Sequence, residues 1–231
     1  MSHFAAPGIV ELLDRFTGED LTRTLAGIEN SVRGLTATDS AFFVERAGAG
    51  REVLAAAGEM KRLSGQINVT IHALGILLCL PHILEPGEIV ESVSLGAGNT
   101  GRMFDLETNF RVAEFKFITW RGGSETIRQN GVFKDFMVMA EHETLKRKYL
   151  YLLGTEQALR FFKGGRALAS VLSKDARRSD GFKARHGDQY KTVGDYFARY
   201  ANTVTIVDVS QWLSELALGL VAAENADAAM S

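Results

Sequence analysis

The chain has 231 residues, of which 46% are hydrophobic and 23% charged, and its formal net charge is −2. This composition is that of an ordinary globular domain and excludes a chain that is disordered throughout. Its single cysteine, Cys79, lies in an apolar run and cannot form an internal disulfide. We therefore expect a buried, inert thiol and no oxidising compartment. The N-terminus lacks a basic segment followed by an apolar one, so a cytoplasmic location is expected.

Residues 1–63 are predicted to form a helical extension, because apolar residues such as Ile9, Leu13 and Phe16 recur at helical spacing. A more apolar helix is expected over 66–84, ended by the turn Glu85-Pro86-Gly87. It is about long enough to cross a membrane, but it contains Asn68, Thr70, His72, Pro81 and His82. The sequence therefore favours a helix buried in a soluble core, without a membrane.

The remaining chain alternates between strand and helix signals. Residues 88–95, 102–107 and 110–120 are short, apolar and rich in branched or aromatic residues, which predicts three strands with a tight turn at Thr108-Asn109. The elements predicted after them are a helix over 124–141, a strand over 147–153, a helix over 155–162, a strand over 203–209 and a helix over 211–222. The expected fold is α/β, a mixed sheet flanked by helices, with one domain over 64–223 and a flexible tail over 224–231.

Three charged residues in this hairpin carry the functional prediction. Glu114 and Lys116 are two apart in a strand and therefore project from one face, between the apolar residues of the other face. With the turn at Thr108-Asn109, Asp105 faces Val112 and lies diagonal to Glu114, within side-chain reach. Two such carboxylates can share a hard cation such as Mg²⁺, and an ammonium beside it can stabilise a phosphate under attack.

This arrangement resembles the signature of the PD-(D/E)XK nucleases, the restriction-endonuclease-like superfamily. Asp105 is followed, after eight residues, by Glu114-Phe115-Lys116. The resemblance implies an αβββαβ core over roughly 66–162, metal binding by Asp105 and Glu114, and a catalytic Lys116. It also implies a supporting polar residue on the next helix, for which Gln129 is the first candidate and Glu125 and Arg128 are alternatives.

The sequence departs from the family pattern in two places. Phe104, not proline, precedes the aspartate, and the first core helix offers Gln66, Asn68 and His72 where the family often has a glutamate. The simpler alternative is that Glu114 and Lys116 form an ion pair on a solvated sheet face. The apolar segment 112–120 around them favours a central strand instead.

Two further segments have competing interpretations. Residues 96–101 spell G-x-G-x-x-G after a strand, but a dinucleotide site would need a helix next, and a strand pattern follows. Residues 163–199 are basic and interleaved with Phe182, His186 and Tyr190, which suits phosphate contacts and stacking on bases, or an ordinary surface loop. The candidate nucleic-acid-binding residues are Lys174, Arg177, Arg178, Lys183 and Arg185.

The sequence thus predicts an Mg²⁺- or Mn²⁺-dependent nuclease that acts on DNA, with RNA not excluded and a homodimer plausible. Two alternatives stay open. One is a nucleic-acid- or protein-binding module that keeps a degenerate nuclease fold, and the missing helix glutamate favours it. The other is a dinucleotide-dependent enzyme that uses the glycine-rich loop.

Overall fold

The computed structural model describes residues 6–16, 21–96, 101–117, 126–173 and 176–216. The chain divides into two compact units, residues 1–68 and 69–231. The predicted tail over 224–231, Ser124 and the second half of the helix predicted over 211–222 lie outside the described residues. The expected domain boundary at 63 lies inside one continuous helix, α4 (Arg51–Ile83), and the division of the units also lies inside that helix.

The first unit is helical, as predicted. It contains α1 (Ala6–Leu13), the short 3₁₀ helix η1 (Asp14–Phe16), α2 (Leu21–Ser31), α3 (Ala37–Arg46) and the first half of α4. Thr36 begins α3 with a capping box, in which its hydroxyl accepts from the backbone of Asp39. The core of this unit is small: Ile9 and Leu13 of α1 pack with Ala56 of α4.

The second unit is built on one five-stranded mixed sheet of order β1-β2-β3-β4-β5. The strands are β1 (Val90–Val93), β2 (Leu106–Thr108), β3 (Arg111–Lys116), β4 (Arg147–Leu152) and β5 (Thr205–Asp208). The first three are antiparallel neighbours, whereas β3, β4 and β5 run parallel. The α/β class and the mixed sheet with helices are therefore as predicted.

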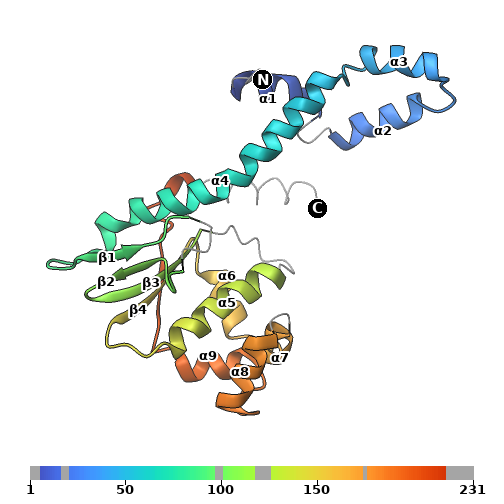
Figure 1. Ribbon diagram of the computed structural model, residues 1–231. Helices are drawn as coiled ribbons and strands as arrows, with labels where there is room; N and C mark the ends of the chain where they lie inside the picture. The colour runs from blue at the N-terminus through green and yellow to red at the C-terminus, as the bar shows by residue number, and fades with distance from the viewer. Residues whose placement is uncertain (1–5, 17–20, 97–100, 118–125, 174–175, 217–231) are drawn as a thin grey trace. The chain divides into compact units, whose positions relative to one another are not determined.

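Helices cover the two faces of this sheet (Figure 1). The C-terminal half of α4 packs Ile76, Cys79 and Ile83 against Phe115 and its neighbours on one face. The other face is covered by α5 (Thr126–Glu141), which connects β3 to β4, and by the helices after β4. These are α6 (Glu156–Phe162), α7 (Leu168–Leu172), α8 (Ala176–His186) and α9 (Val193–Tyr200).

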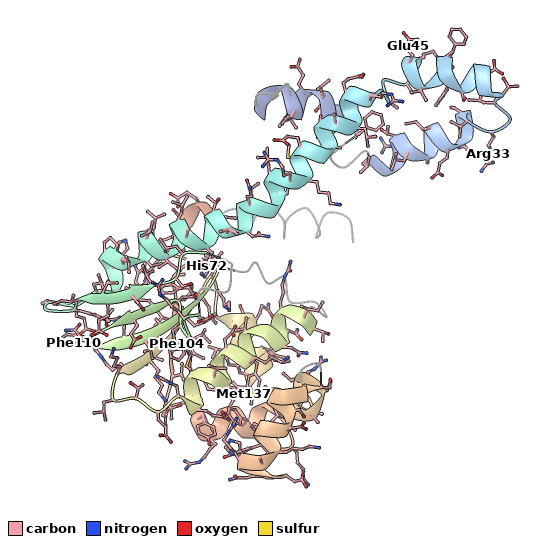
Figure 2. The ribbon with its side chains drawn as sticks, viewed as in Figure 1. Arg33, Glu45, His72, Phe104, Phe110 and Met137 are labelled. Carbon is pink, nitrogen blue, oxygen red and sulfur yellow. The ribbon has the colours of Figure 1, made fainter. Side chains whose placement is uncertain are left out.

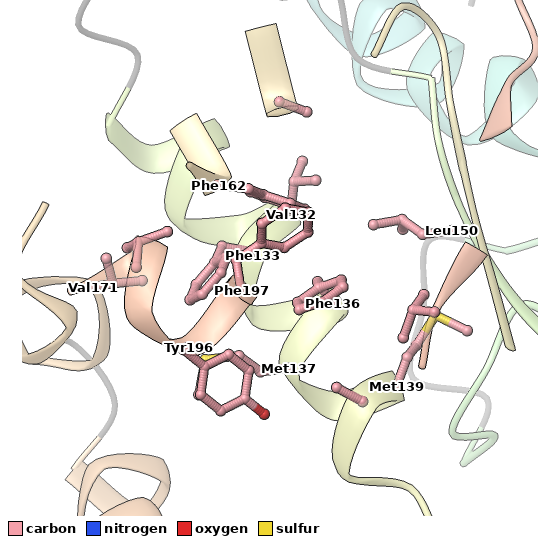
Figure 3. Packing of buried hydrophobic residues seen from close by; sticks show 14 of the residues in the cluster. Val132, Phe133, Phe136, Met137, Met139, Leu150, Phe162, Val171, Tyr196 and Phe197 are labelled. Carbon is pink, nitrogen blue, oxygen red and sulfur yellow. The ribbon is translucent and has the colours of Figure 1, made fainter. Parts of the chain in front are cut away.

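The hydrophobic cluster on the α5 side of the sheet contains several aromatic rings that contact one another (Figure 3). Phe133 and Phe136 of α5 contact Phe162 of α6 and Tyr196 of α9, with ring centroids 5.2 to 6.4 Å apart. Leu150 of β4 joins the same cluster. This packing fixes α5 over the sheet, and α5 contributes to the candidate site described below.

The hairpin register differs from the prediction by two residues. Glu107 pairs with Val112 and Leu106 with Ala113, so the turn lies at Asn109-Phe110 and not at Thr108-Asn109. Thr108 stays in the strand, and its hydroxyl accepts hydrogen bonds from the backbone of Phe110 and Arg111. Asp105 directly precedes β2, so the predicted diagonal placement of Asp105 and Glu114, which depended on the turn at Thr108-Asn109, is replaced by this register.

The helix predicted over 66–84 is also different from expectation. It is the second half of α4, and only 17% of the most apolar 18-residue window of α4 is buried. By length and composition alone α4 could span a membrane, which is weak evidence because core helices pass the same test. The helix was predicted to be buried in a core, but only one of its faces packs on the sheet, while Leu74, Leu77 and Leu78 are 43 to 56% exposed.

The basic segment is folded rather than a surface loop. Residues 163–199 contain α7, α8 and α9. Phe182 is buried, and Tyr190 packs against the same core. Phe182 is therefore not available to stack on an unpaired base, whereas stacking by the partly buried Tyr190 and His186 stays a prediction.

Candidate active site

Asp105, Glu114 and Lys116 lie together at the start of β2 and the end of β3. The Nζ atom of Lys116 lies 2.7 Å from Oε1 of Glu114. The Oδ2 atom of Asp105 accepts a hydrogen bond of 2.9 Å from the backbone N–H of Phe115, the residue between them. The alternation of β3 places Glu114 and Lys116 on the face that α5 covers, and Phe115 on the face that α4 covers.

A fourth residue, Asp135 of α5, completes the cluster. Its Oδ2 atom lies 3.2 Å from Nζ of Lys116, so the ammonium is held between two carboxylates. Sequence reasoning missed Asp135. The available signal was an acidic residue between Phe133 and Phe136, in a helix that connects two neighbouring parallel strands and must lie over β3.

The helix α4 adds His72 (Figure 2), whose Nε2 atom lies 3.3 Å from Oδ1 of Asp105. The helix approaches the end of β3 closely at Gly75, where a Cβ atom would lie 2.5 Å from the ring of Phe117. The absence of a side chain at Gly75 therefore helps to bring His72 within reach of Asp105. Both oxygens of Asp105 are thus engaged, one by a backbone N–H and one by an imidazole.

The cluster is only partly accessible to water. The side chains of Asp105, Glu114 and Lys116 are 14%, 15% and 24% exposed. Burial raises the pKa of Glu114 from its ordinary 4.5 to about 7; the charges of Asp105 and Asp135 act in the same direction and Lys116 opposes them. Burial by itself lowers the pKa of Lys116, but the attraction of Asp135 and Glu114 outweighs it and raises that pKa above its ordinary value.

The donor set of this cluster fits a magnesium-like cation that completes its coordination with water and phosphate. No group of three or more His, Cys, Asp or Glu residues suited to a metal occurs among the described residues, so a cage made by the protein alone is not present there. Asp105 and Glu114 are close enough for the charge of one to raise the pKa of the other. Two carboxylates plus substrate oxygens are the usual protein contribution to Mg²⁺ binding.

The other predicted residues are placed as follows. Gln129 is half-buried in the first turn of α5, nearly two turns before Asp135, and its supporting role stays a prediction. Lys174 and the glycine-rich residues 97–100 lie outside the described residues. The described residues that follow this loop, 101–117, form strands and no helix, which argues against a dinucleotide site.

The basic residues of α8 have different environments. Lys183 is exposed, whereas Arg185 lies 2.6 Å from Glu141 of α5, with its side chain 55% exposed. Glu141 also contacts His186 and accepts a hydrogen bond from the buried Tyr196. The structure describes the backbone of Arg177 and Arg178 in α8 but not their side chains. One function of Arg185 is therefore structural, as it ties α8 to α5.

Comparisons with protein-family models, with curated proteins and with solved structures found no match for this chain.

Proposed function

We propose that this chain is a metal-dependent nuclease of the PD-(D/E)XK type that hydrolyses phosphodiester bonds in DNA. The observation that carries the proposal is the convergence of Asp105, Glu114 and Lys116 in one partly buried cluster. Buried charges are costly unless they are paired or serve a ligand. Three acidic groups around one ammonium leave an excess of negative charge, which suits a divalent cation.

The topology supports the same proposal. A helix is followed by three antiparallel strands, a crossover helix and a parallel strand. This is the order that the family resemblance implies, and it puts the aspartate at the second strand and Glu114-Phe115-Lys116 at the end of the third. The restriction-endonuclease-like core is therefore part of the proposal.

Each residue has a distinct role in the proposed reaction. Asp105 and Glu114 would hold Mg²⁺ or Mn²⁺, which when bound makes a coordinated water more acidic and neutralises phosphate charge. Lys116 would hold its ammonium next to the phosphate, and stabilise the charge that develops there. Asp135 would keep Lys116 in place when Glu114 turns from the ammonium toward the cation. Gln129 stays the proposed supporting polar group.

A binding module with an impaired site is the second candidate. The observation that favours it is that Lys116 is ion-paired on two sides, to Glu114 and Asp135. In addition, the helix α4 supplies His72 to Asp105 where the family often has a glutamate. Such a module would recognise nucleic acid or a protein without cutting.

The experiment that separates the two candidates is a cleavage assay on supercoiled plasmid and on single-stranded DNA, with and without Mn²⁺ or Mg²⁺. We expect cleavage that depends on the metal and falls at least ~100-fold in Lys116→Ala, in the range of one lost transition-state contact. Asp105→Asn and Glu114→Gln should also abolish the metal-dependent cleavage.

Lys146→Ala is the matched control. Lys146 is a second lysine near the same sheet, but it pairs with Glu91 and Glu107 away from the cluster. Its loss should leave cleavage near the wild-type rate. Absence of cleavage of every DNA tested, or equal cleavage by wild type and Lys116→Ala, would remove the nuclease proposal.

A further inference from the structure

The first unit contains a cavity of about 500 Å³ between α1, η1 and the first half of α4. Its walls are mostly apolar. Leu13 and Phe16 line one side, and Val53, Leu54 and Met60 line the other. Small-molecule sites usually have volumes of about 300–1,000 Å³ and mainly apolar walls. The cavity is therefore large enough for a ligand with an apolar body.

This cavity lies next to the small core of the first unit. Leu13 belongs to the buried cluster of that core, and Val53 and Met60 pack against the cluster. Leu54, which also lines the cavity, is 75% exposed. An apolar group in the cavity would remove these side chains from water, and the burial of apolar surface stabilises an association. A ligand would thus extend a core that the unit alone leaves small.

One end of the cavity carries polar groups. Lys61 and Ser64 are three residues apart on α4, so the ammonium and the hydroxyl lie on one face of the helix. Among the described residues that line the cavity, Lys61 is the only charged one. It forms no ion pair with the part of the chain that the structure describes, whereas the neighbouring Arg62 pairs with Glu59 at 2.5 Å. This end of the cavity therefore offers an unpaired cation to a ligand.

The opposite end of the cavity is near an acidic group. Ala49 and Gly50 line the cavity just before α4 begins, and the carboxylate of Glu52 lies against Gly50. Glu52 and Lys61 are nine residues apart, which is about 14 Å along the helix at about 1.5 Å per residue. An anionic group is attracted to the end at Lys61 and repelled from the end at Glu52. The charges therefore set the direction in which an anionic ligand lies.

We propose that this cavity binds a free acyl carboxylate, a small ligand with an apolar chain and an anionic head. The head lies beside Lys61 and Ser64, where an ammonium and a hydroxyl can donate hydrogen bonds to the carboxylate. The chain packs against the apolar walls toward Gly50. The distance of roughly 14 Å between the two ends suits a chain of medium length, such as that of dodecanoate. The whole site lies within the first unit and is independent of the proposed nuclease activity.

The charges on the first half of α4 argue against a membrane surface as the source of the acyl chain. Arg51 and Lys61 are accompanied by the exposed Glu52, and Arg62 is engaged by Glu59. Helices that lie on anionic membranes carry Lys and Arg along the side of the apolar face. The mixed charges here do not form such a basic face, whereas a single anionic head is matched by Lys61.

The test is the binding of dodecanoate to the full chain by isothermal titration calorimetry, below the concentrations at which micelles form. We expect dodecanoate to bind, and dodecylammonium, with the same chain and the opposite charge, to bind at least ~10-fold more weakly. Lys61→Gln should weaken the binding of dodecanoate by at least ~10-fold. Its circular dichroism should match that of the wild type, because Lys61 is exposed.

Arg62→Gln is the matched control. It removes one positive charge from the next position of α4, where the side chain is 52% exposed, pairs with Glu59 and does not line the cavity. This variant should bind dodecanoate as the wild type does.

Hydrogen exchange gives the location of the ligand. Saturating dodecanoate should slow the exchange of amides in α1 and in the first half of α4 by at least ~10-fold and leave those of β4 unchanged. No binding, equal binding of the two amphiphiles, or equal loss in Lys61→Gln and Arg62→Gln would overturn the proposal. Binding to phosphatidylglycerol vesicles but not to free dodecanoate would overturn it in favour of a membrane. Protection of α1 by an amphipathic helical peptide, or by a rise in protein concentration, but not by dodecanoate would overturn it in favour of a protein partner or a second copy.

Discussion

Glu114 is the residue whose environment departs most from that of an exposed carboxylate in the candidate site. Its pKa is raised to about 7, chiefly by burial, and its one strong contact is the ammonium of Lys116. Ionisation of this carboxyl group costs more free energy in the folded state, where it is buried, than in the unfolded state, where water surrounds it. Such a cost is typical of a residue that is kept for a ligand and not for stability.

This gives a prediction about stability and pH. The pKa of Glu114 is higher in the folded state than its ordinary 4.5, so folding favours the protonated form. The penalty is absent below pH 4.5 and grows as pH rises to about 7, to on the order of 3 kcal/mol at about 1.4 kcal/mol per pKa unit. Glu114→Gln should therefore be more stable than wild type at pH 8 but not at pH 4.5, measured by urea unfolding.

Glu91→Gln is the matched control for this prediction. Glu91 lies on β1 with its side chain 48% exposed. It should show no comparable gain at pH 8. An equal or smaller stability for Glu114→Gln than for wild type at pH 8 would mean that the attraction of Lys116 outweighs burial.

At the scale of elements, Arg111 fastens the start of β3. Its guanidinium is buried and pairs with Glu88, whose side chain is fully buried, with Glu85 at 3.1 Å, and with the hydroxyl of Tyr151 at 2.8 Å. It also lies over the ring of Tyr149, 4.7 Å from the centroid. These contacts join the turn after α4 to β3 and β4.

Arg111→Met should be strongly destabilising, because it leaves the carboxylate of Glu88 buried without its cation. Removing one partner of a buried pair costs on the order of 3–5 kcal/mol. Arg147→Met is the control: Arg147 pairs with the same Glu85, but its side chain is 47% exposed. Denaturant unfolding should show a large loss for the first variant and little change for the second. Similar losses for both would contradict this account.

Elements with clear periodicity could be predicted from the sequence. The register of the β2–β3 hairpin and the contacts between elements distant in the sequence could not. The strands β3 and β4 and the helices α5 and α6 were predicted because their apolar patterns are regular. The turn at Asn109-Phe110 was misplaced because composition favours Thr-Asn. At the observed turn, Arg111 is buried against Glu88. The side chain of Asn109 also forms hydrogen bonds with the backbone of Ile89 and Gly87.

The candidate site followed the same division. Glu114 and Lys116 could be paired from their spacing within one strand, and Asp105 could be assigned to the neighbouring strand, although the register of the hairpin was predicted wrongly. The contacts of Asp135 and His72 depend on how α5 and α4 pack on the sheet, which no local pattern encodes. The spacing of Phe182 and Tyr190 likewise does not distinguish residues that pack in the core from residues that stack on bases.

At the scale of the whole molecule, the two units have very different cores. Among the described residues, the buried cluster of the first unit consists of Ile9, Leu13 and Ala56. The second unit has two larger clusters, one on each face of the sheet. Local stability depends on buried apolar contacts, so the first unit is expected to open more readily.

Hydrogen exchange measured by mass spectrometry should show this difference within one sample. Amides of α2 and α3 should exchange at least ~100-fold faster than those of β4, a difference of about 2.7 kcal/mol in opening free energy. The amides of α5 serve as an internal control and should be protected like those of β4. Equal protection across both units would show that the small core of the first unit is reinforced by further contacts.

The parallel edge of the sheet has a consequence for synthesis on the ribosome. The candidate active site, from Asp105 to Asp135, is synthesised before residue 142. The edge strand β5 begins only at Thr205, after four more helices. Parallel pairing across such a long connection is slow to form. A nascent chain therefore exposes the unpaired edge of β4 until β5 emerges, and this interval is when it depends most on protection from aggregation.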